Sequence, residues 1–363
     1  MLKAGQAEGK TMTNFWCKRY GAQRWWLIII IAASVLTALV FWRVQESATQ
    51  FVFQQEIKTN SVLSTISQAG SRYLNKQGKP LPEYRSEVTL LDQLQTSFGD
   101  VYTALDDANG HGYTTAMIQS SQIAARYQTH SGEWLPVDSQ TRLNQQVRYY
   151  QTLADHQQVF APTDLTTGFP NGLLPMLHRL LTGWIGALLV FINGLTYFLA
   201  RQAKDRPLVR LSVSHYADLL AIERREYGAY SMIGAGTILI VTVGLTLLNG
   251  SRVFSDSTLS WSYQVNVAGD TILTASGWPI LLFGLAAFAQ ARLAQTGALI
   301  FRSPFIQILI AAIIPLLFGW QTQALALVMS ASDVLPTFFM TIVAWVGSYC
   351  GTNAWLRRRG AMN

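Results

Sequence analysis

The sequence predicts an all-α integral membrane protein with six transmembrane helices and a helical extracytoplasmic domain between the first and the second. Half of the residues are hydrophobic and only 13% are charged, roughly half the charged fraction of an average soluble domain. The apolar residues gather in segments of about 20, which as helices cross the roughly 30 Å of hydrocarbon in a bilayer. One long polar segment with helical periodicity separates the first apolar segment from the others.

Six segments qualify as transmembrane helices. They are Trp25–Trp42, Leu180–Ala200, Met232–Gly250, Thr271–Ala291, Phe305–Trp320 and Val334–Trp355. Pro279, Pro315 and Pro336 lie inside or at the edge of three of them, where neighbouring helices can satisfy the freed carbonyl groups. Glycines that predict close helix packing in this half of the chain are Gly183, Gly186, Gly194, Gly234, Gly244, Gly277 and Gly284.

The basic residues predict that both termini are cytoplasmic, in a multi-pass protein of the cell membrane. With six spans, sixteen basic residues that flank the spans fall on one side. They are Lys3, Lys10, Lys18, Arg19, Arg24, Arg201, Lys204, Arg206, Arg210, Arg224, Arg225, Arg292, Arg302, Arg357, Arg358 and Arg359. The segment 44–172 carries eight basic and twelve acidic residues, a net charge of −4, and is assigned to the other side. The overall charge of +7 is thus explained by membrane topology, and no nucleic-acid partner is expected.

The chain is accordingly divided into four parts. Residues 1–24 are a cytoplasmic segment, 25–42 the first transmembrane helix, 43–172 the extracytoplasmic domain, and 173–363 a five-helix membrane domain with a cytoplasmic loop at 201–230. The first span is interpreted as an uncleaved anchor, because it is longer than the apolar core of a signal peptide and no Ala-x-Ala site follows.

The segment before the first span mixes aromatic and basic residues. This composition is typical of a short helix that lies in the inner membrane interface, and an ordinary basic flank that fixes orientation explains it equally well. The candidate interfacial residues are Phe15, Trp16, Lys18, Arg19 and Arg24.

The polar segment has the spacing of amphipathic helices, with breaks at 78–82, 109–112 and around Pro136. Three or four helices that pack into a small bundle are expected. The apolar positions recur at steps of three and four and are Val62, Ile66, Ala69, Tyr73, Leu91, Leu94, Phe98, Val101, Leu105, Leu143, Val147 and Tyr150.

No catalytic, metal or cofactor site is expected in this segment. His111, His130 and His156 lie far apart in the sequence, without a matching carboxylate or nucleophile, and are interpreted as surface histidines. Cys17 and Cys350 lie at opposite ends of the chain, so no disulfide framework is expected.

The cytoplasmic loop at 201–230 predicts a short amphipathic helix. Ser214 is a suitable N-cap, and the negative charge of Asp218 in the first turn interacts favourably with the positive end of the helix dipole. The charged cluster that follows is Glu223, Arg224, Arg225 and Glu226. Such a helix docks on a cytoplasmic partner or, on the alternative interpretation, caps the membrane helices at the interface.

The apolar segments carry no centrally placed Asp, Glu, Lys or His, and Asn193 and Thr246 are the strongest polar candidates. Because ion-driven transporters use intramembrane ionisable groups, that class is disfavoured. The absence of paired histidines or a Gly-x-Ser-x-Gly motif also disfavours an intramembrane protease or acyltransferase.

Taken together, the layout resembles the permease subunit of an ABC transporter of the ABC-2 type. The matching segments are Asn14–Arg24, which corresponds to the family's interfacial elbow helix, and Ser214–Tyr227, which corresponds to the helix that couples to an ATPase. The resemblance implies an exporter without an ATP site of its own, working as a permease dimer, homomeric or heteromeric, in the lipid bilayer with separate ATP-binding cassette subunits. The hairpin Gln321–Asp333 departs from the pattern, because many relatives place re-entrant helices there.

Two other functions are compatible with the sequence. A non-transporting membrane sensor or envelope assembly protein would use the outer helical bundle to bind a ligand or partner, with effectors on separate chains. A membrane enzyme is the least favoured, because it needs a positioned nucleophile or an acid-base pair.

Overall fold

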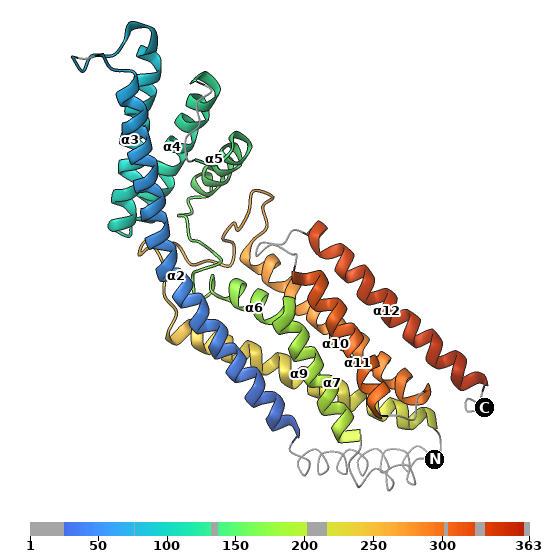
Figure 1. Ribbon diagram of the computed structural model, residues 1–363. Helices are drawn as coiled ribbons and strands as arrows, with labels where there is room; N and C mark the ends of the chain where they lie inside the picture. Colours follow the sequence, from blue (N-terminus) through green and yellow to red (C-terminus); the bar gives the residue numbers. More distant parts are fainter. Residues whose placement is uncertain are drawn as a thin grey trace. The chain divides into compact units, whose positions relative to one another are not determined.

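The computed structural model describes residues 25–75, 77–131, 137–201, 216–300, 304–323 and 331–358, and most of these are helical (Figure 1). The helices are α2 (Trp25–Arg72), the 3-10 turn η1 (Pro82–Tyr84), α3 (Arg85–Asp106), α4 (Gly110–Ser131), α5 (Gln140–Asp155), α6 (Leu173–Leu181), α7 (Gly183–Arg201), α9 (Tyr216–Leu248), α10 (Ile272–Ile300), α11 (Pro304–Gln323) and α12 (Ala331–Arg358). No strand occurs in the described ranges, only the isolated bridges Leu74–Pro80 and Gln264–Thr271. The all-α fold class is confirmed.

The chain separates into two compact units. The apolar unit takes its described residues from the ranges up to Val40, Met176–Gly244 and from Ser276 onward. The bundle unit contains Phe41–Pro175 and Leu245–Ala275. The second stretch of the bundle unit was not foreseen from the sequence, which treats it as the ends of two spans and their connection.

Four described helical stretches are long and apolar enough to cross a membrane: Trp26–Arg72, Gly228–Leu248, Ile272–Ala294 and Phe305–Thr322. A fifth candidate is the pair α6 and α7, which is bent by 59°. In α12 the apolar stretch found among the described residues, Phe338–Gly351, is shorter than these. The prediction of apolar helices of spanning length is therefore confirmed, whereas the count of six uninterrupted spans is met only in part.

The predicted second span, Leu180–Ala200, is interrupted at its beginning. Helix α6 ends at Leu181, and Gly183 has a φ of +62°, a left-handed conformation that glycine adopts without steric cost. The hydroxyl of Thr182 donates to the carbonyl oxygen of His178 and so satisfies one of the last carbonyls of α6. These local bonds end one helix and allow the next to begin in another direction.

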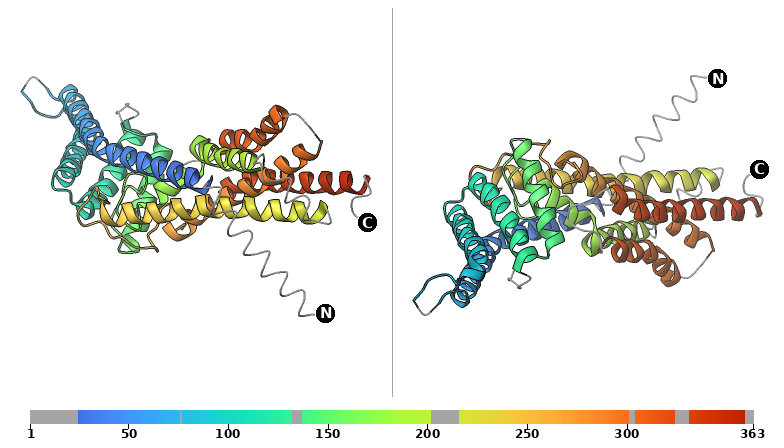
Figure 2. Two further views of the ribbon diagram at one scale, coloured as in Figure 1. Left: turned by 90° about the horizontal axis from the view of Figure 1, so that it is seen from below. Right: turned by 90° about the horizontal axis from the view of Figure 1, so that it is seen from above.

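Two helices, α2 and α9, extend furthest beyond the predicted spans. Helix α2 continues from Trp25 to Arg72, about 72 Å at 1.5 Å per residue, because its first glycine is Gly70 and it contains no proline. Helix α9 is likewise unbroken from Tyr216 to Leu248, and the left view of Figure 2 shows it in yellow. The predicted short helix after the second span is thus not a separate element. It is continuous with the third predicted span.

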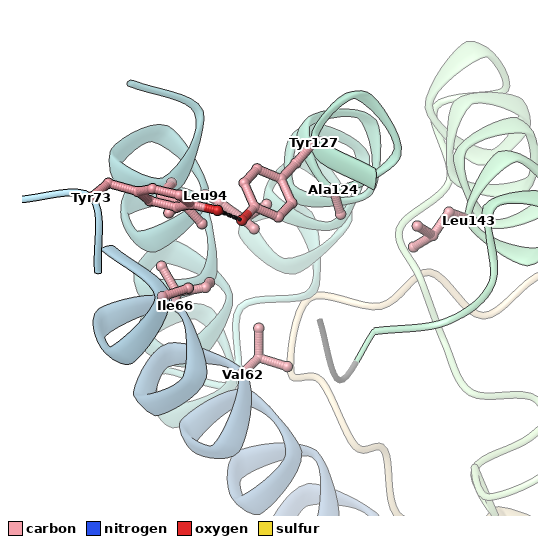
Figure 3. Close-up of a cluster of buried hydrophobic side chains, with 9 residues drawn as sticks. Val62, Ile66, Tyr73, Leu94, Ala124, Tyr127 and Leu143 are labelled. Atoms are coloured by element: carbon pink, nitrogen blue, oxygen red, sulfur yellow. Dashed lines mark hydrogen bonds between the residues drawn. The ribbon is translucent and has the colours of Figure 1, made fainter. Parts of the chain in front are cut away.

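The core of the bundle unit is formed by the apolar faces of α2, α3, α4 and α5 (Figure 3). Helix α4 packs against both α3 and α5. The hydroxyls of Tyr73 and Tyr127 lie 3.4 Å apart inside this core. Its buried residues are Val62, Ile66, Ala69, Tyr73, Leu91, Leu94, Ala124, Tyr127 and Leu143. The predicted helical periodicity of this segment is confirmed. Val62, Ile66 and Ala69 of α2 lie in the core, as do Leu91 and Leu94 of α3.

In the apolar unit, α7 packs closely on α11. The backbone N–H of Gly183 donates to the hydroxyl of Thr322 at 2.7 Å. A Cβ atom added to Gly319 would lie 2.6 Å from the Trp184 ring and 2.9 Å from the Cβ of Ala187. The two backbones therefore approach each other at a position where only glycine fits.

The predicted glycine contacts are confirmed at some positions and wrong at others. Gly186 and Gly194 each have a neighbour within 3.0 Å of an added Cβ, and Gly234 has Ile29 at 3.2 Å, a tight contact. Gly183, Gly244, Gly277 and Gly284 have no described atom within 4 Å of an added Cβ, so no side chain is excluded there by packing within the described residues.

Candidate functional site

The predicted coupling residues lie at the beginning of α9. Asp218, Glu223, Arg224, Arg225 and Glu226 occupy its first turns, directly before the apolar stretch Gly228–Leu248. Residues 216–227 extend the helix by about 18 Å beyond that stretch. The predicted N-cap Ser214 and the interfacial candidates Phe15, Trp16, Lys18, Arg19 and Arg24 lie outside the described residues.

Two buried amides lie inside the apolar unit. Asn193 on α7 and Gln290 on α10 are 2% and 0% exposed. A Cβ added to Gly194 would lie 2.8 Å from Cδ of Gln290, and one added to Gly234 would lie 3.6 Å from the Asn193 amide. The amides thus fill the space that two glycines leave between α7, α9 and α10. Asn193 was expected from the sequence, whereas Gln290 was overlooked because it stands beside the basic flank.

Arg292 is buried, although the sequence places it in a cytoplasmic connection. Helix α10 continues past it to Ile300, and the residue is 8% exposed. Its guanidinium carbon lies 5.1 Å from the ring centre of Tyr349 and 6.0 Å from that of Phe288. Contact with the faces of aromatic rings compensates a cation for part of the hydration free energy that it loses on burial. Arg292 therefore joins α10 to α12 as a packed residue.

The bundle unit contains a solvent-open cavity of about 300 Å³ lined by residues of α2, α3, α4 and α5. Three charged side chains meet at its lining. Lys58 Nζ and Arg142 Nη1 each lie 3.5 Å from a carboxylate oxygen of Asp138, and the Gln146 amide donates to Asp138 Oδ2 at 2.8 Å. Sequence spacing gives no sign of this group, because Lys58 is separated from Asp138 by two helices.

The connection between α9 and α10 is bonded to the bundle by a buried tyrosine. Tyr263 accepts a hydrogen bond from the backbone N–H of Ala161 at 2.7 Å, and its hydroxyl donates toward the Val159 carbonyl at 3.0 Å. The ring of Tyr113 packs against Phe254 from the same connection at 5.0 Å. These contacts fasten residues 249–271 to α4 and to the chain after α5.

Burial raises the pKa of several tyrosines in this cluster. It raises the pKa of Tyr113 to about 12 and that of Tyr149 to about 12. Burial also raises the pKa of Tyr150 and Tyr263 well above the ordinary value, and the neighbouring tyrosines add to this rise. The cause is that a phenolate loses its hydration in the apolar interior.

The bundle unit is therefore expected to lose stability as the pH rises above 10. A pKa raised by folding gives stability that is fully present below the unfolded value of 10.0 and is lost as the pH rises through the folded value, about 12 for Tyr149. Circular dichroism against pH, with tyrosinate absorbance recorded in parallel, measures the effect. Ionisation of these tyrosines near pH 10 in the folded protein would contradict it.

A second group of polar side chains lies between α3 and α4. The hydroxyl of Ser86 lies 3.2 Å from Nε2 of His130 and donates to Glu87 Oε2 at 2.8 Å, while Glu87 Oε1 lies 3.5 Å from the same Nε2. The hydrogen bond from its own backbone N–H, followed by that from Ser86, lowers the pKa of Glu87. In a catalytic triad the serine and the carboxylate contact opposite ring nitrogens. Here both contact Nε2, so this group does not activate the serine.

Among the described residues, no group of three or more His, Cys, Asp or Glu is arranged to hold a metal ion. Comparison with known proteins found no matching family model, no matching curated protein and no matching solved structure. The functional argument therefore rests on the residues and the geometry of this chain.

Proposed function

We propose that this chain is the transmembrane permease subunit of an ATP-driven exporter of the ABC-2 type, coupled to a separate ATP-binding subunit. In this proposal it works in the cell membrane as a dimer, with six spans, cytoplasmic termini and an extracytoplasmic bundle unit. ATP hydrolysis takes place on the partner chain. The apolar helices of spanning length and the charged beginning of α9 support the proposal.

The observation that carries the proposal is the continuity of α9. Its first turns contain the charged cluster from Asp218 to Glu226, and its last residues, Leu245–Leu248, belong to the bundle unit. A helix without a break transmits an axial or tilting movement from one end to the other. Force that a partner applies to the charged turns is thus delivered to the bundle unit.

The connection after α9 extends this path. Asp256 accepts hydrogen bonds from the backbone N–H groups of Gly110 and His111, at 2.6 and 2.8 Å. Ser255 donates from its backbone N–H to the carbonyl of Ala108 at 3.0 Å. Because these bonds join the connection to the first turn of α4, movement of the end of α9 is passed on to the bundle.

Copurification tests the proposal directly. The tagged chain, extracted in mild detergent from its native membrane, is expected to retain an ATP-binding subunit and to change that subunit's ATPase rate. The proposal fails if no such subunit is retained and the purified chain leaves the rate of any candidate ATPase unchanged.

Replacement of the charged pair Glu223 and Arg224 by alanine is expected to lower the chain-dependent ATPase rate about tenfold, within the usual range of coupling energies. Membrane insertion should not change, because the apolar stretch from Gly228 onward is untouched. The double replacement Asp100→Asn and Arg148→Gln, at exposed positions of the bundle unit, is the matched control. Full activity of the Glu223 and Arg224 variant would count against a coupling role.

A sensor or envelope assembly protein is the second candidate, and the cavity of the bundle unit favours it. Such a protein needs a ligand site outside the membrane but no ATPase. The presence of a regulator gene beside this one, in place of an ATPase gene, would favour the sensor.

A further inference from the structure

We propose that the cavity of the bundle unit binds a small organic carboxylate that carries an aromatic or apolar group, the chemistry of an N-acylated amino acid or of the last residue of a peptide. The cavity measures about 300 Å³, which is at the lower end of the range for small-molecule pockets. The proposal concerns the bundle unit alone and stands whether the chain transports or signals.

The cavity has a surplus of positive charge. The described charged residues of its lining are Lys58, Arg142 and Asp138, two cations and one anion. The Asp138 side chain is 19% exposed, whereas those of Lys58 and Arg142 are 51% and 70% exposed. The largely buried carboxylate of Asp138 thus pairs with Lys58 and Arg142, whose side chains remain in contact with solvent.

These two cations have donors for a second carboxylate. An ammonium group carries three N–H donors and a guanidinium five, and each cation contacts Asp138 at 3.5 Å through a single nitrogen. Asp138 also accepts the Gln146 amide at the shorter distance of 2.8 Å. A ligand carboxylate would balance the remaining charge and pair with the planar guanidinium, the geometry in which arginine recognises carboxylates.

Aromatic rings and buried hydroxyls form other parts of the lining. Tyr113 stacks on Phe160 with ring centres 5.4 Å apart, and Tyr150 meets the edge of Phe160 at 5.3 Å. These rings hold one another in place, so the apolar wall is formed before a ligand arrives. Ser120 and Ser121, each almost fully buried, add hydroxyl groups beside it. A ligand with a ring, an amide and a carboxylate matches all three features.

Isothermal titration calorimetry on the purified full chain tests the proposal with two probes of the same shape. N-acetyl-phenylalanine carries the carboxylate, and N-acetyl-phenylalanine amide replaces it by a neutral group. We expect the acid to bind about tenfold more tightly than the amide, because one charge-assisted pair is lost. Arg142→Gln, which leaves Lys58 and Asp138 as a balanced pair, should weaken binding of the acid by about the same factor.

Arg148→Gln is the matched control, because Arg148 is exposed on the same helix α5 and does not line the cavity. It should bind the acid like the native chain. Ser121→Leu places apolar atoms in the cavity and should abolish binding without changing the elution of the purified chain in size-exclusion chromatography. Absence of binding at millimolar concentration, equal affinity for acid and amide, or equal weakening by Arg142→Gln and Arg148→Gln would each overturn the proposal.

Discussion

Replacement of Gly319 by leucine is expected to destabilise the apolar unit by about 3 kcal/mol, the upper part of the usual range for overpacked interiors. The new Cβ would lie 2.6 Å from the ring of Trp184 and 2.9 Å from the Cβ of Ala187. The tryptophan ring, which is 47% exposed, can swing outward, but Ala187 cannot retreat without a shift of the α7 backbone. The larger side chain must therefore separate α7 from α11.

The thermal midpoint of the detergent-solubilised chain, read by size-exclusion chromatography after heating, measures this effect. Gly284→Leu is the control, because Gly284 is exposed on α10 and has no described atom within 4 Å of an added Cβ. That variant should be neutral or more stable by about 0.8 kcal/mol, the helix preference of other residues over glycine. Equal midpoints for the two variants would show that the contact of α7 with α11 is not as close as described.

The sequence predicts the bundle core well because that core depends on local periodicity. Val62, Ile66, Ala69 and Tyr73 recur at helical spacing, and all four are buried in the core. The same holds for Leu91 and Leu94 on α3. A helix with an apolar face toward a core and a polar face toward water shows this pattern in its sequence, whichever helix it packs against. The breaks between helices are equally local, since they depend on glycine, proline and asparagine.

Features that depend on distant residues were not predictable in this way. The polar connection 249–271 has no period, and its contacts join Asp256 to Gly110 and Tyr263 to Ala161, more than 100 positions apart. The length of α2 was missed for a different reason. Hydropathy falls after Trp42 and marks the end of the apolar stretch, but no glycine or proline ends the helix there. Apolar length and helix length are separate properties of one sequence.

Substitution of Asp256 by alanine is expected to destabilise the bundle unit by about 2 kcal/mol, since it removes two charge-assisted hydrogen bonds to N–H groups at the start of α4. The carboxylate accepts from Gly110 at 2.6 Å and from His111 at 2.8 Å, where a negative charge also complements the positive end of the helix. Gly110 has room for no side chain, because an added Cβ would lie 2.9 Å from the same carboxylate. The local cap Asn109 accepts from the backbone N–H of Gly112 at 2.8 Å, so it does not take over the two N–H groups that Asp256 serves.

Hydrogen exchange resolves this prediction by position. In Asp256→Ala the amides of the first turn of α4 should exchange faster, together with those of residues 254–257, while the core amides of α3 change little. Asp256→Asn keeps one acceptor oxygen and should fall between the native chain and the alanine variant. Asp100→Ala, at an exposed position of α3, should leave the exchange of α4 unchanged. If the α4 amides exchange as slowly in Asp256→Ala as in the native chain, this carboxylate does not hold the connection 249–271 against α4. The proposed path from α9 to α4 would then lack its strongest hydrogen bonds.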